Sequence, residues 1–132
     1  SLEYNKQISG SNKKINNNNT SIIFELGYKN NEILFMGNAE SELEDYLLGK
    51  YDKILDTDVL KVGHHGSNSG SQQSFLDMVT ANYAIISVGK NNKFGHPSAR
   101  TIKKIERTNS NILRTDLNGD VTCLVNESIV CK

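Results

Sequence analysis

Short apolar segments of β-strand composition alternate along this chain with segments of helical periodicity, and this alternation restricts the fold more than any other feature. The expected strands cover residues 21–27, 32–36, 58–62, 83–88, 111–115 and 120–125. The expected helices cover residues 41–48, 71–80 and 98–108. Because strands and helices alternate, the sequence predicts an α/β fold with a mixed, partly parallel sheet packed against helices.

The helix expected over 41–48 begins in an acidic segment. Ser41 and Glu44 have the spacing of a capping box, in which two side chains bond to backbone N–H groups at the helix start. The acidic segment 40–45 as a whole is typical of a solvated face near a helix N-terminus, where negative charge is favourable. The sequence therefore predicts that these carboxylates serve the helix start and face water.

Residues 1–19 differ in composition from the rest of the chain. Ser, Asn, Lys and Gly dominate, the apolar residues have no period, and the segment ends in four consecutive asparagines at 16–19. Such a composition is typical of a flexible leader or the end of a linker. We therefore place the folded domain at 20–132.

The length of 132 residues suits one domain with a buried core and is too short for two full domains. The 15 basic and 15 acidic side chains cancel, which excludes a strongly charged disordered protein. Residues 1–66 carry 7 basic and 10 acidic side chains (net −3), and residues 67–132 carry 8 and 5 (net +3), which allows an anionic substrate near the second half. Since no apolar run approaches the roughly 20 residues that span a bilayer, we expect neither a membrane helix nor a signal peptide.

The two cysteines, Cys123 and Cys131, lie near the C-terminus. If the chain forms a hairpin with Asn126 and Glu127 at its turn, Cys123 faces Val130, and Cys131 has the wrong parity to face Cys123. The pattern favours two buried or free thiols over a disulfide and leaves the redox compartment open.

All three histidines of the chain lie in loops that follow expected strands. His64 and His65 lie in a Gly-His-His-Gly-Ser loop, His96 lies in a Gly-His-Pro loop, and Asn38 lies in a Gly-Asn-Ala loop after an earlier strand. In open α/β sheets, ligands bind outside the carboxyl ends of the strands. We therefore expect these loops to form the functional site.

The Gly-His-His-Gly-Ser loop carries the residue types of a catalytic or metal-binding site. Imidazole is a common metal ligand and a natural proton shuttle, and the flanking glycines allow a sharp turn close to a substrate. Ser67 and the N–H groups of such a turn can hold an anionic oxygen. The alternative is a surface loop with two solvated histidines, because adjacent histidines are not a chelating pair by geometry.

His96 and Asn38 are also open to two interpretations. His96 can bind substrate or deliver a proton to a leaving group, or it can be a loop residue held by Pro97. Asn38, taken alone, is typical of a loop or capping asparagine.

Four motifs follow one another along the chain. They are Ile-Leu-Phe-Met-Gly-Asn-Ala-Glu at 33–40, Asp-Val-Leu-Lys-Val-Gly-His-His-Gly-Ser at 58–67, Ala-Ile-Ile-Ser-Val-Gly and then Asn-Lys-Phe-Gly-His-Pro within 84–97, and Arg-Thr-Asp and then Gly-Asp within 114–120. In this order they resemble the metallo-β-lactamase-like domain of the ComEC competence-protein family. The resemblance covers most of the chain, and its Leu-Lys-Val-Gly-His-His-Gly-Ser element is highly specific.

This resemblance implies a four-layer αββα sandwich built from two halves, of which residues 20–132 are the C-terminal half. It implies a hydrolase of phosphodiester-type substrates, which in ComEC proteins accompanies DNA uptake. It also implies a place in a membrane protein, with this domain on the extracellular face.

The same resemblance assigns roles to individual residues. His65, or less favourably His64, occupies a metal-ligand position, and Asn38 occupies the position of the family's bridging Asp. The other histidine serves as proton donor or phosphate contact, so that His64, His65 and His96 form the catalytic set. The implied substrate-binding residues are Ser67, Asn92 and His96.

The chain departs from the family pattern in two ways. It has no H-x-[HD]-x-D-H cluster, which the family's first half supplies, and no histidine precedes Asn38. An asparagine amide is also neutral and a poorer ligand for zinc than a carboxylate. The complete family domain implies zinc or manganese, but we expect this chain alone to bind no catalytic metal.

Two functions follow from these observations. The chain is the C-terminal part of a metal-dependent phosphodiesterase or nuclease, or it is a degenerate, non-catalytic binding or scaffolding module of a DNA-uptake complex. The expected partners are the missing N-terminal half of the domain, DNA or another phosphodiester, and a second copy that covers an exposed sheet face.

Overall fold

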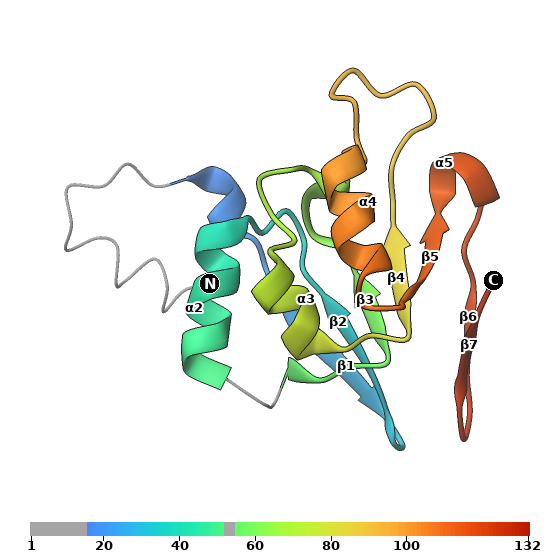
Figure 1. Cartoon of the computed structure of the whole chain (residues 1–132). Helices are drawn as coiled ribbons and strands as arrows, with labels where there is room; N and C mark the ends of the chain where they lie inside the picture. Colours follow the sequence, from blue (N-terminus) through green and yellow to red (C-terminus); the bar gives the residue numbers. More distant parts are fainter. Residues whose placement is uncertain (1–15, 52–54) are drawn as a thin grey trace.

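In the computed structural model, which describes residues 16–51 and 55–132, five strands form one mixed sheet in the order β1-β2-β3-β4-β5 (Figure 1). They are β1 (Phe24–Tyr28), β2 (Asn31–Phe35), β3 (Val59–Lys61), β4 (Tyr83–Ile86) and β5 (Asn111–Arg114). β1 pairs antiparallel with β2, and the pairs from β2 to β5 are all parallel. The predicted α/β class and mixed sheet are therefore confirmed.

Helices pack against one face of this sheet (Figure 1). They are α2 (Ser41–Tyr51), α3 (Gln73–Val79) and α4 (Ala99–Glu106). The parallel register aligns Leu34, Leu60 and Ala84 across β2, β3 and β4, and these side chains form a buried core with the apolar faces of the helices. None of the helices in the described ranges has the length and apolar character needed to cross a membrane.

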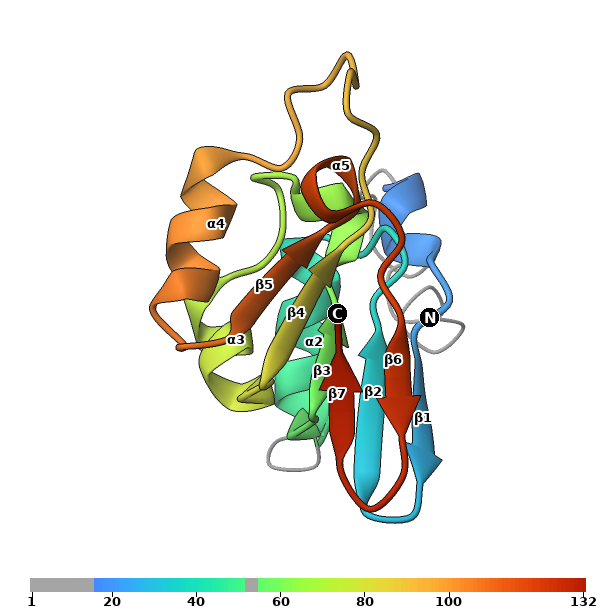
Figure 2. The same ribbon diagram turned by 90° about the vertical axis from the view of Figure 1, so that its right-hand side faces the viewer.

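A hairpin of β6 (Cys123–Val125) and β7 (Ile129–Cys131) lies over the opposite face of the sheet (Figure 2). It follows the short helix α5 (Thr115–Asn118). Its inward side chains form a second, smaller core with Val59 and Leu113. The sheet thus lies between a layer of helices and a two-stranded layer.

Three apolar side chains of β1 remain half-exposed beside this hairpin. Phe24, Leu26 and Tyr28 are 50%, 52% and 54% exposed, and their register partners place them on the face that the hairpin covers elsewhere. Leu124 and Val130, on the outer side of the hairpin, are also more than half exposed. Part of the sheet face is therefore uncovered in the described chain.

Glu44 corrects the prediction of a capping box and of a solvated acidic face. Its side chain is buried, and its carboxylate accepts hydrogen bonds from the backbone N–H groups of Ser71 (2.6 Å) and Gln72 (2.9 Å). Burial raises the pKa of this carboxyl, and the two backbone hydrogen bonds oppose that rise without cancelling it. Glu44 therefore joins α2 to the start of α3 instead of capping its own helix.

The expected leader is partly folded. The 3-10 helix η1 (Asn17–Thr20) belongs to the ordered chain, and Asn19 within it is buried. Residues 1–15 lie outside the described residues. The last asparagines of the run find polar partners on the domain.

Cys123 and Cys131 form a disulfide, which corrects the preference for free thiols. The hairpin turns through three residues, 126–128, and not two, so Val125 pairs with Ile129 and Cys123 with Cys131. The backbone N–H of Asn126 closes this turn on the carbonyl of Ser128. One extra turn residue reverses the parity on which the sequence-based prediction rested.

Candidate functional site

Three loops meet at the carboxyl edge of the parallel strands, as predicted. They follow β2, β3 and β4, and they contain Asn38, the two adjacent histidines and His96. The backbone N–H of His64 donates to the carbonyl of Gly37 (3.0 Å), and that of Ser98 donates to the carbonyl of Gly66 (2.9 Å). The middle loop is therefore bonded to both of its neighbours.

The middle loop contains η3 (Gly63–Gly66), whose two histidines have left-handed backbone conformations. The φ angles are +44° at His64 and +53° at His65, and Gly66 follows at +76°. Such conformations cost of order 1 kcal/mol or more for residues with a Cβ and are concentrated at functional sites.

The flanking glycines allow the neighbouring loops to approach closely. A Cβ atom at Gly63 would lie 2.8 Å from the carbonyl oxygen of Ala39. At Gly66 it would lie 2.6 Å from the Cβ of Pro97. The Gly-His-His-Gly spacing thus serves the contact between loops as well as the turn itself.

The ring of His64 makes contact with each of the other two histidine rings. Its centroid is 6.3 Å from that of His65 and 5.6 Å from that of His96, and both contacts are edge-on. Phe94 also stacks on His96, with the ring centroids 5.8 Å apart. Burial and the positive charge that His64 and His65 can carry lower the pKa of His96.

His65 is exposed, and its ring is oriented from the neighbouring strand. Its Nδ1 lies 2.7 Å from the carbonyl oxygen of Ser87, just beyond β4. Because a carbonyl oxygen only accepts, Nδ1 carries the proton, and the neutral ring keeps a lone pair on Nε2. This is the arrangement that a metal ligand or a general base requires.

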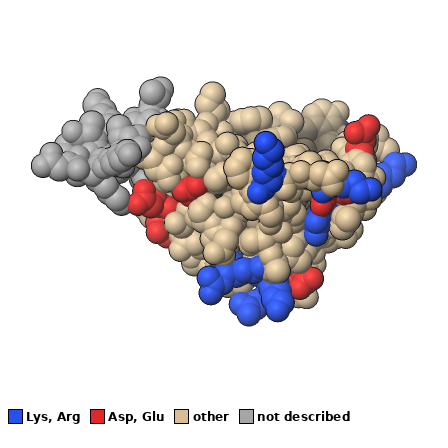
Figure 3. Space-filling view, turned by 90° about the horizontal axis from the view of Figure 1, so that it is seen from above, with Lys and Arg blue, Asp and Glu red and all other residues tan. Residues whose placement is uncertain are grey.

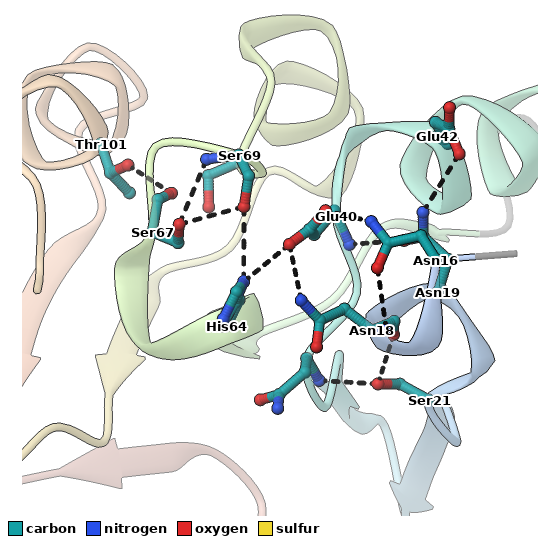
Figure 4. A network of polar contacts seen from close by, with 12 residues as sticks. Asn16, Asn18, Asn19, Ser21, Glu40, Glu42, His64, Ser67, Ser69 and Thr101 are labelled. Carbon is teal, nitrogen blue, oxygen red and sulfur yellow. Dashed lines mark hydrogen bonds and ion pairs between the residues drawn. The ribbon is translucent and has the colours of Figure 1, made fainter. Parts of the chain in front are cut away.

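Glu40 is a residue of this site that the sequence analysis assigned to a solvated face. Its Oε1 lies 3.0 Å from Nδ1 of His64, and Ser69 Oγ lies 3.3 Å from the same nitrogen (Figure 4). Burial raises the pKa of the Glu40 carboxyl, but hydrogen bonds from Asn18, Asn16 and Ser69 and the charge of His64 outweigh it and lower the pKa. Glu40 follows β2, and β2 pairs with β3, the strand that precedes His64. This position was the signal that could have placed Glu40 in the site.

The remaining predicted residues lie in or beside these loops. Ser67 is buried, and its hydroxyl bonds to that of Ser69 at 3.0 Å. The amide of Asn92 donates to the carbonyl of His96 and accepts from its N–H, so it closes the third loop. Asn38 is exposed, and its backbone N–H donates to Ser21 Oγ. Substrate or metal contacts of these three residues stay predictions.

The residues of this site do not by themselves fit the metal that the resemblance implies. Among residues 16–51 and 55–132, no group of three or more His, Cys, Asp or Glu side chains is arranged to hold a metal ion. Asn38 adds a neutral amide in place of a carboxylate. No chemical step through a metal follows from these residues alone.

The surface seen from the side of the loops is mostly uncharged. Seen from the side on which the 89–97 loop protrudes, most of the surface is neither acidic nor basic, and Lys and Arg side chains gather along one side (Figure 3). The acidic side chains lie mainly towards the two ends of the same view.

Curated proteins match this chain over most of its length. ComE operon protein 3 of Bacillus subtilis (strain 168) is 35% identical over 104 residues, which are 79% of this chain and 13% of that protein. Competence protein ComA of Neisseria gonorrhoeae is 35% identical over 107 residues, 81% of this chain and 16% of that protein. Recombination protein 2 of Haemophilus influenzae is 34% identical over 91 residues, which are 69% of this chain and 11% of that protein. Over these stretches the chain is similar to competence proteins.

The chain spans only 11–16% of the length of these competence proteins. No protein-family model and no solved structure matches it. The similarity therefore concerns one segment of each competence protein.

Proposed function

We propose that this chain is the C-terminal part of a hydrolytic, phosphodiesterase- or nuclease-like domain of a DNA-uptake protein. The observation that carries the proposal is the meeting of His64 with His65 and His96 at the carboxyl edge of a parallel sheet. Homology to competence proteins supports DNA as the substrate class. DNA or another phosphodiester is then the ligand of these loops.

In this proposal each of the three histidines has a separate role at the substrate phosphate. His65 offers a lone pair on Nε2 to a cation or a proton, and His64 supplies or removes a proton. His96 contacts the phosphate, whose negative charge would oppose the repulsion among the imidazoles. Asn92 and Ser67 fix the loops that present these rings.

Zinc or manganese belongs to the complete domain in this proposal. His65 and Asn38 are the ligands that this chain would contribute, and the others come from the N-terminal half of the domain. Bound metal would supply an activated water for hydrolysis. Because the present residues do not complete such a site, the activity depends on that partner half.

Asn38 favours a second candidate, a non-catalytic binding module of the same DNA-uptake complex. Without the bridging carboxylate, two divalent ions would be held far less tightly. The fold and the histidine loops would then be retained for binding only.

Metal analysis and hydrolysis of bis-p-nitrophenyl phosphate separate the two candidates. The complete gene product that contains this chain is purified with its native Asn38 and as Asn38→Asp. Near-stoichiometric zinc or manganese with cleavage by the native form supports the enzyme. If neither form binds metal or cleaves the ester, the hydrolytic proposal fails and the binding module stands.

The half-exposed apolar side chains of β1 are the proposed contact for the N-terminal half. Phe24, Leu26 and Tyr28 continue the sheet face on which the β6–β7 hairpin already packs. Leu26→Lys should weaken a complex with that half, while Lys103→Glu, at an exposed position on α4 and on the opposite face of the sheet, should not. Light scattering that shows a dimer of the isolated chain, broken by Leu26→Lys, would assign the surface to a second copy instead.

The proposed location is the extracellular face of a membrane protein. The Cys123–Cys131 disulfide supports this, because disulfides persist in oxidising compartments and are rare in reducing ones. Reporter fusions to the complete gene product test it. If a fused reporter that works only in the cytoplasm is active, the proposed extracellular location is contradicted.

A further inference from the structure

The carboxylate of Glu40 is bonded on both oxygens by the asparagine segment 16–19 and by one histidine. Asn18 Nδ2 donates to Oε1 at 2.7 Å, and Asn16 Nδ2 donates to Oε2 at 2.5 Å (Figure 4). Oε1 also lies 3.0 Å from Nδ1 of His64. A fourth link ties the backbone, because the N–H of Glu40 donates to Asn19 Oδ1 at 2.9 Å.

These contacts restrict where Glu40 can be. Its side chain is 15% exposed and that of His64 is 23% exposed, so water competes weakly for either group. η1 is itself capped by Asn16, whose side-chain oxygen accepts from the N–H of Asn18. The asparagines therefore form a short ordered strap that holds the carboxylate beside the imidazole.

Two groups face Nδ1 of His64, Glu40 Oε1 at 3.0 Å and Ser69 Oγ at 3.3 Å, and the closer carboxylate favours a proton on this nitrogen of the neutral imidazole. A lone pair on Nδ1 would face a carboxylate oxygen at 3.0 Å, which is repulsive, whereas a proton on Nδ1 makes a charge-assisted hydrogen bond. The second ring nitrogen, Nε2, is turned away from Glu40 (Figure 4). It is left as the lone-pair atom, in the manner of histidines oriented by a carboxylate behind them.

The strap supplies neutral donors, and this choice has a consequence. A lysine or arginine at the positions of Asn16 and Asn18 would pair with the carboxylate and cancel its charge. The asparagine amides hold the carboxylate in place without that cancellation, so its negative charge still acts on His64.

We propose that Glu40, clamped by Asn16 and Asn18, is the positioning residue that holds neutral His64 in the Nδ1–H tautomer and leaves Nε2 as the reactive atom. The chemical use of that atom rests on the proposed function, but the tautomer does not. The asparagine run at 16–19 is thereby part of the site and not a spacer.

Long-range proton–nitrogen NMR of the 132-residue chain with labelled histidine tests this, in mildly alkaline buffer where the imidazoles are neutral. Nitrogen shifts distinguish a protonated from an unprotonated ring nitrogen. We expect His64 to be mainly Nδ1–H, by about tenfold over Nε2–H, as a charge-assisted hydrogen bond provides. Signals are assigned with His64→Gln, His65→Gln and His96→Gln.

In Glu40→Ala the preference should be lost and Nε2–H should become the major form. Asn16→Ala with Asn18→Ala should weaken the preference without abolishing it. Glu42→Ala is the matched control, because Glu42 accepts from Asn19 of the same strap at 3.3 Å, and it should leave the His64 tautomer unchanged.

Two results would overturn the proposal: mainly Nε2–H at His64 in the native chain, or an unchanged Nδ1–H preference in folded Glu40→Ala. The native measurement decides even if Glu40→Ala fails to fold. The readout is independent of ester cleavage, so a correct tautomer in a protein without hydrolytic activity would refute the proposed function alone.

Discussion

Gly66 and Pro97, from two different loops, are in such close contact that a Cβ atom on Gly66 would lie 2.6 Å from the Cβ of Pro97. This contact and the hydrogen bond from Ser98 N–H to the Gly66 carbonyl hold the His96 loop against the His64 loop. The relative position of His64 and His96 therefore depends on Gly66, whose backbone joins their two loops.

Gly66→Ala should lower the free energy of unfolding by about 2–4 kcal/mol, because it adds a steric clash to a left-handed backbone conformation. Urea denaturation measures this loss. Gly95→Ala is the matched control: Gly95 also has a positive φ (+68°), but nothing lies near its missing Cβ. That control should lose only about 1 kcal/mol. Equal losses in the two variants would show that the Pro97 contact is unimportant.

The sequence predicted the parts of this structure that depend on local pattern. The alternation of strands and helices gave the parallel sheet, and the rule for strand ends brought His64, His65 and His96 to one edge. It missed Glu40 and the asparagine strap, because their contacts join segments more than 20 residues apart. No periodicity signals such a contact.

The hairpin shows a second kind of limit. A single extra turn residue at 126–128 changes which side chains face each other, and turn length is not fixed by the Asn-Glu-Ser sequence. Glu44 shows a third kind of limit. Its spacing from Ser41 matches a capping box, but its carboxylate accepts hydrogen bonds from the distant N–H groups of Ser71 and Gln72 instead.

Breaking the Cys123–Cys131 disulfide should destabilise the hairpin layer. In the chain-entropy model, a loop this short contributes about 2–3 kcal/mol to the free energy of unfolding. A reductant should therefore lower the urea midpoint of the native chain. The double variant Cys123→Ser with Cys131→Ser should begin at the lower midpoint and not respond to reductant. A midpoint that reductant leaves unchanged in the native chain would contradict the assigned bond.

Glu44→Gln should destabilise the chain by about 1–3 kcal/mol, because an amide leaves one of two buried backbone N–H groups without an acceptor. Glu106→Gln, at an exposed position at the end of α4, is the control and should change little. Thermal unfolding of both variants measures the difference. Similar stability of the Glu44 and Glu106 variants would count against a structural role for the buried carboxylate.

The difference in stability between the native chain and Glu44→Gln should depend on pH. Burial raises the folded-state pKa of Glu44 above its unfolded value, so the stability linked to this carboxyl is present at low pH and is lost as pH rises through the folded pKa. The gap between the native chain and Glu44→Gln should therefore narrow from acidic to neutral pH. A gap that widens over this range would reverse the assigned direction.

His96 should titrate below the ordinary histidine value of 6.5, since burial and repulsion from His64 and His65 disfavour its charged form. NMR titration of the His96 ring protons measures the midpoint. His64→Ala should raise it by removing the nearer charge, and His65→Ala should raise it less. Phe94→Leu should also raise it by opening the ring to water, but without altering the difference between the two histidine variants.

The sign of the accompanying stability change follows from the lowered pKa. Above the unfolded pKa both states hold a neutral His96, and as pH falls the unfolded chain takes up the proton first. Stability linked to His96 is thus present near neutral pH and is lost as pH falls through the folded pKa. His96→Gln should remove this loss between neutral and mildly acidic pH. A midpoint above 6.5 in the native chain would contradict the repulsion of the charged His96 ring by His64 and His65.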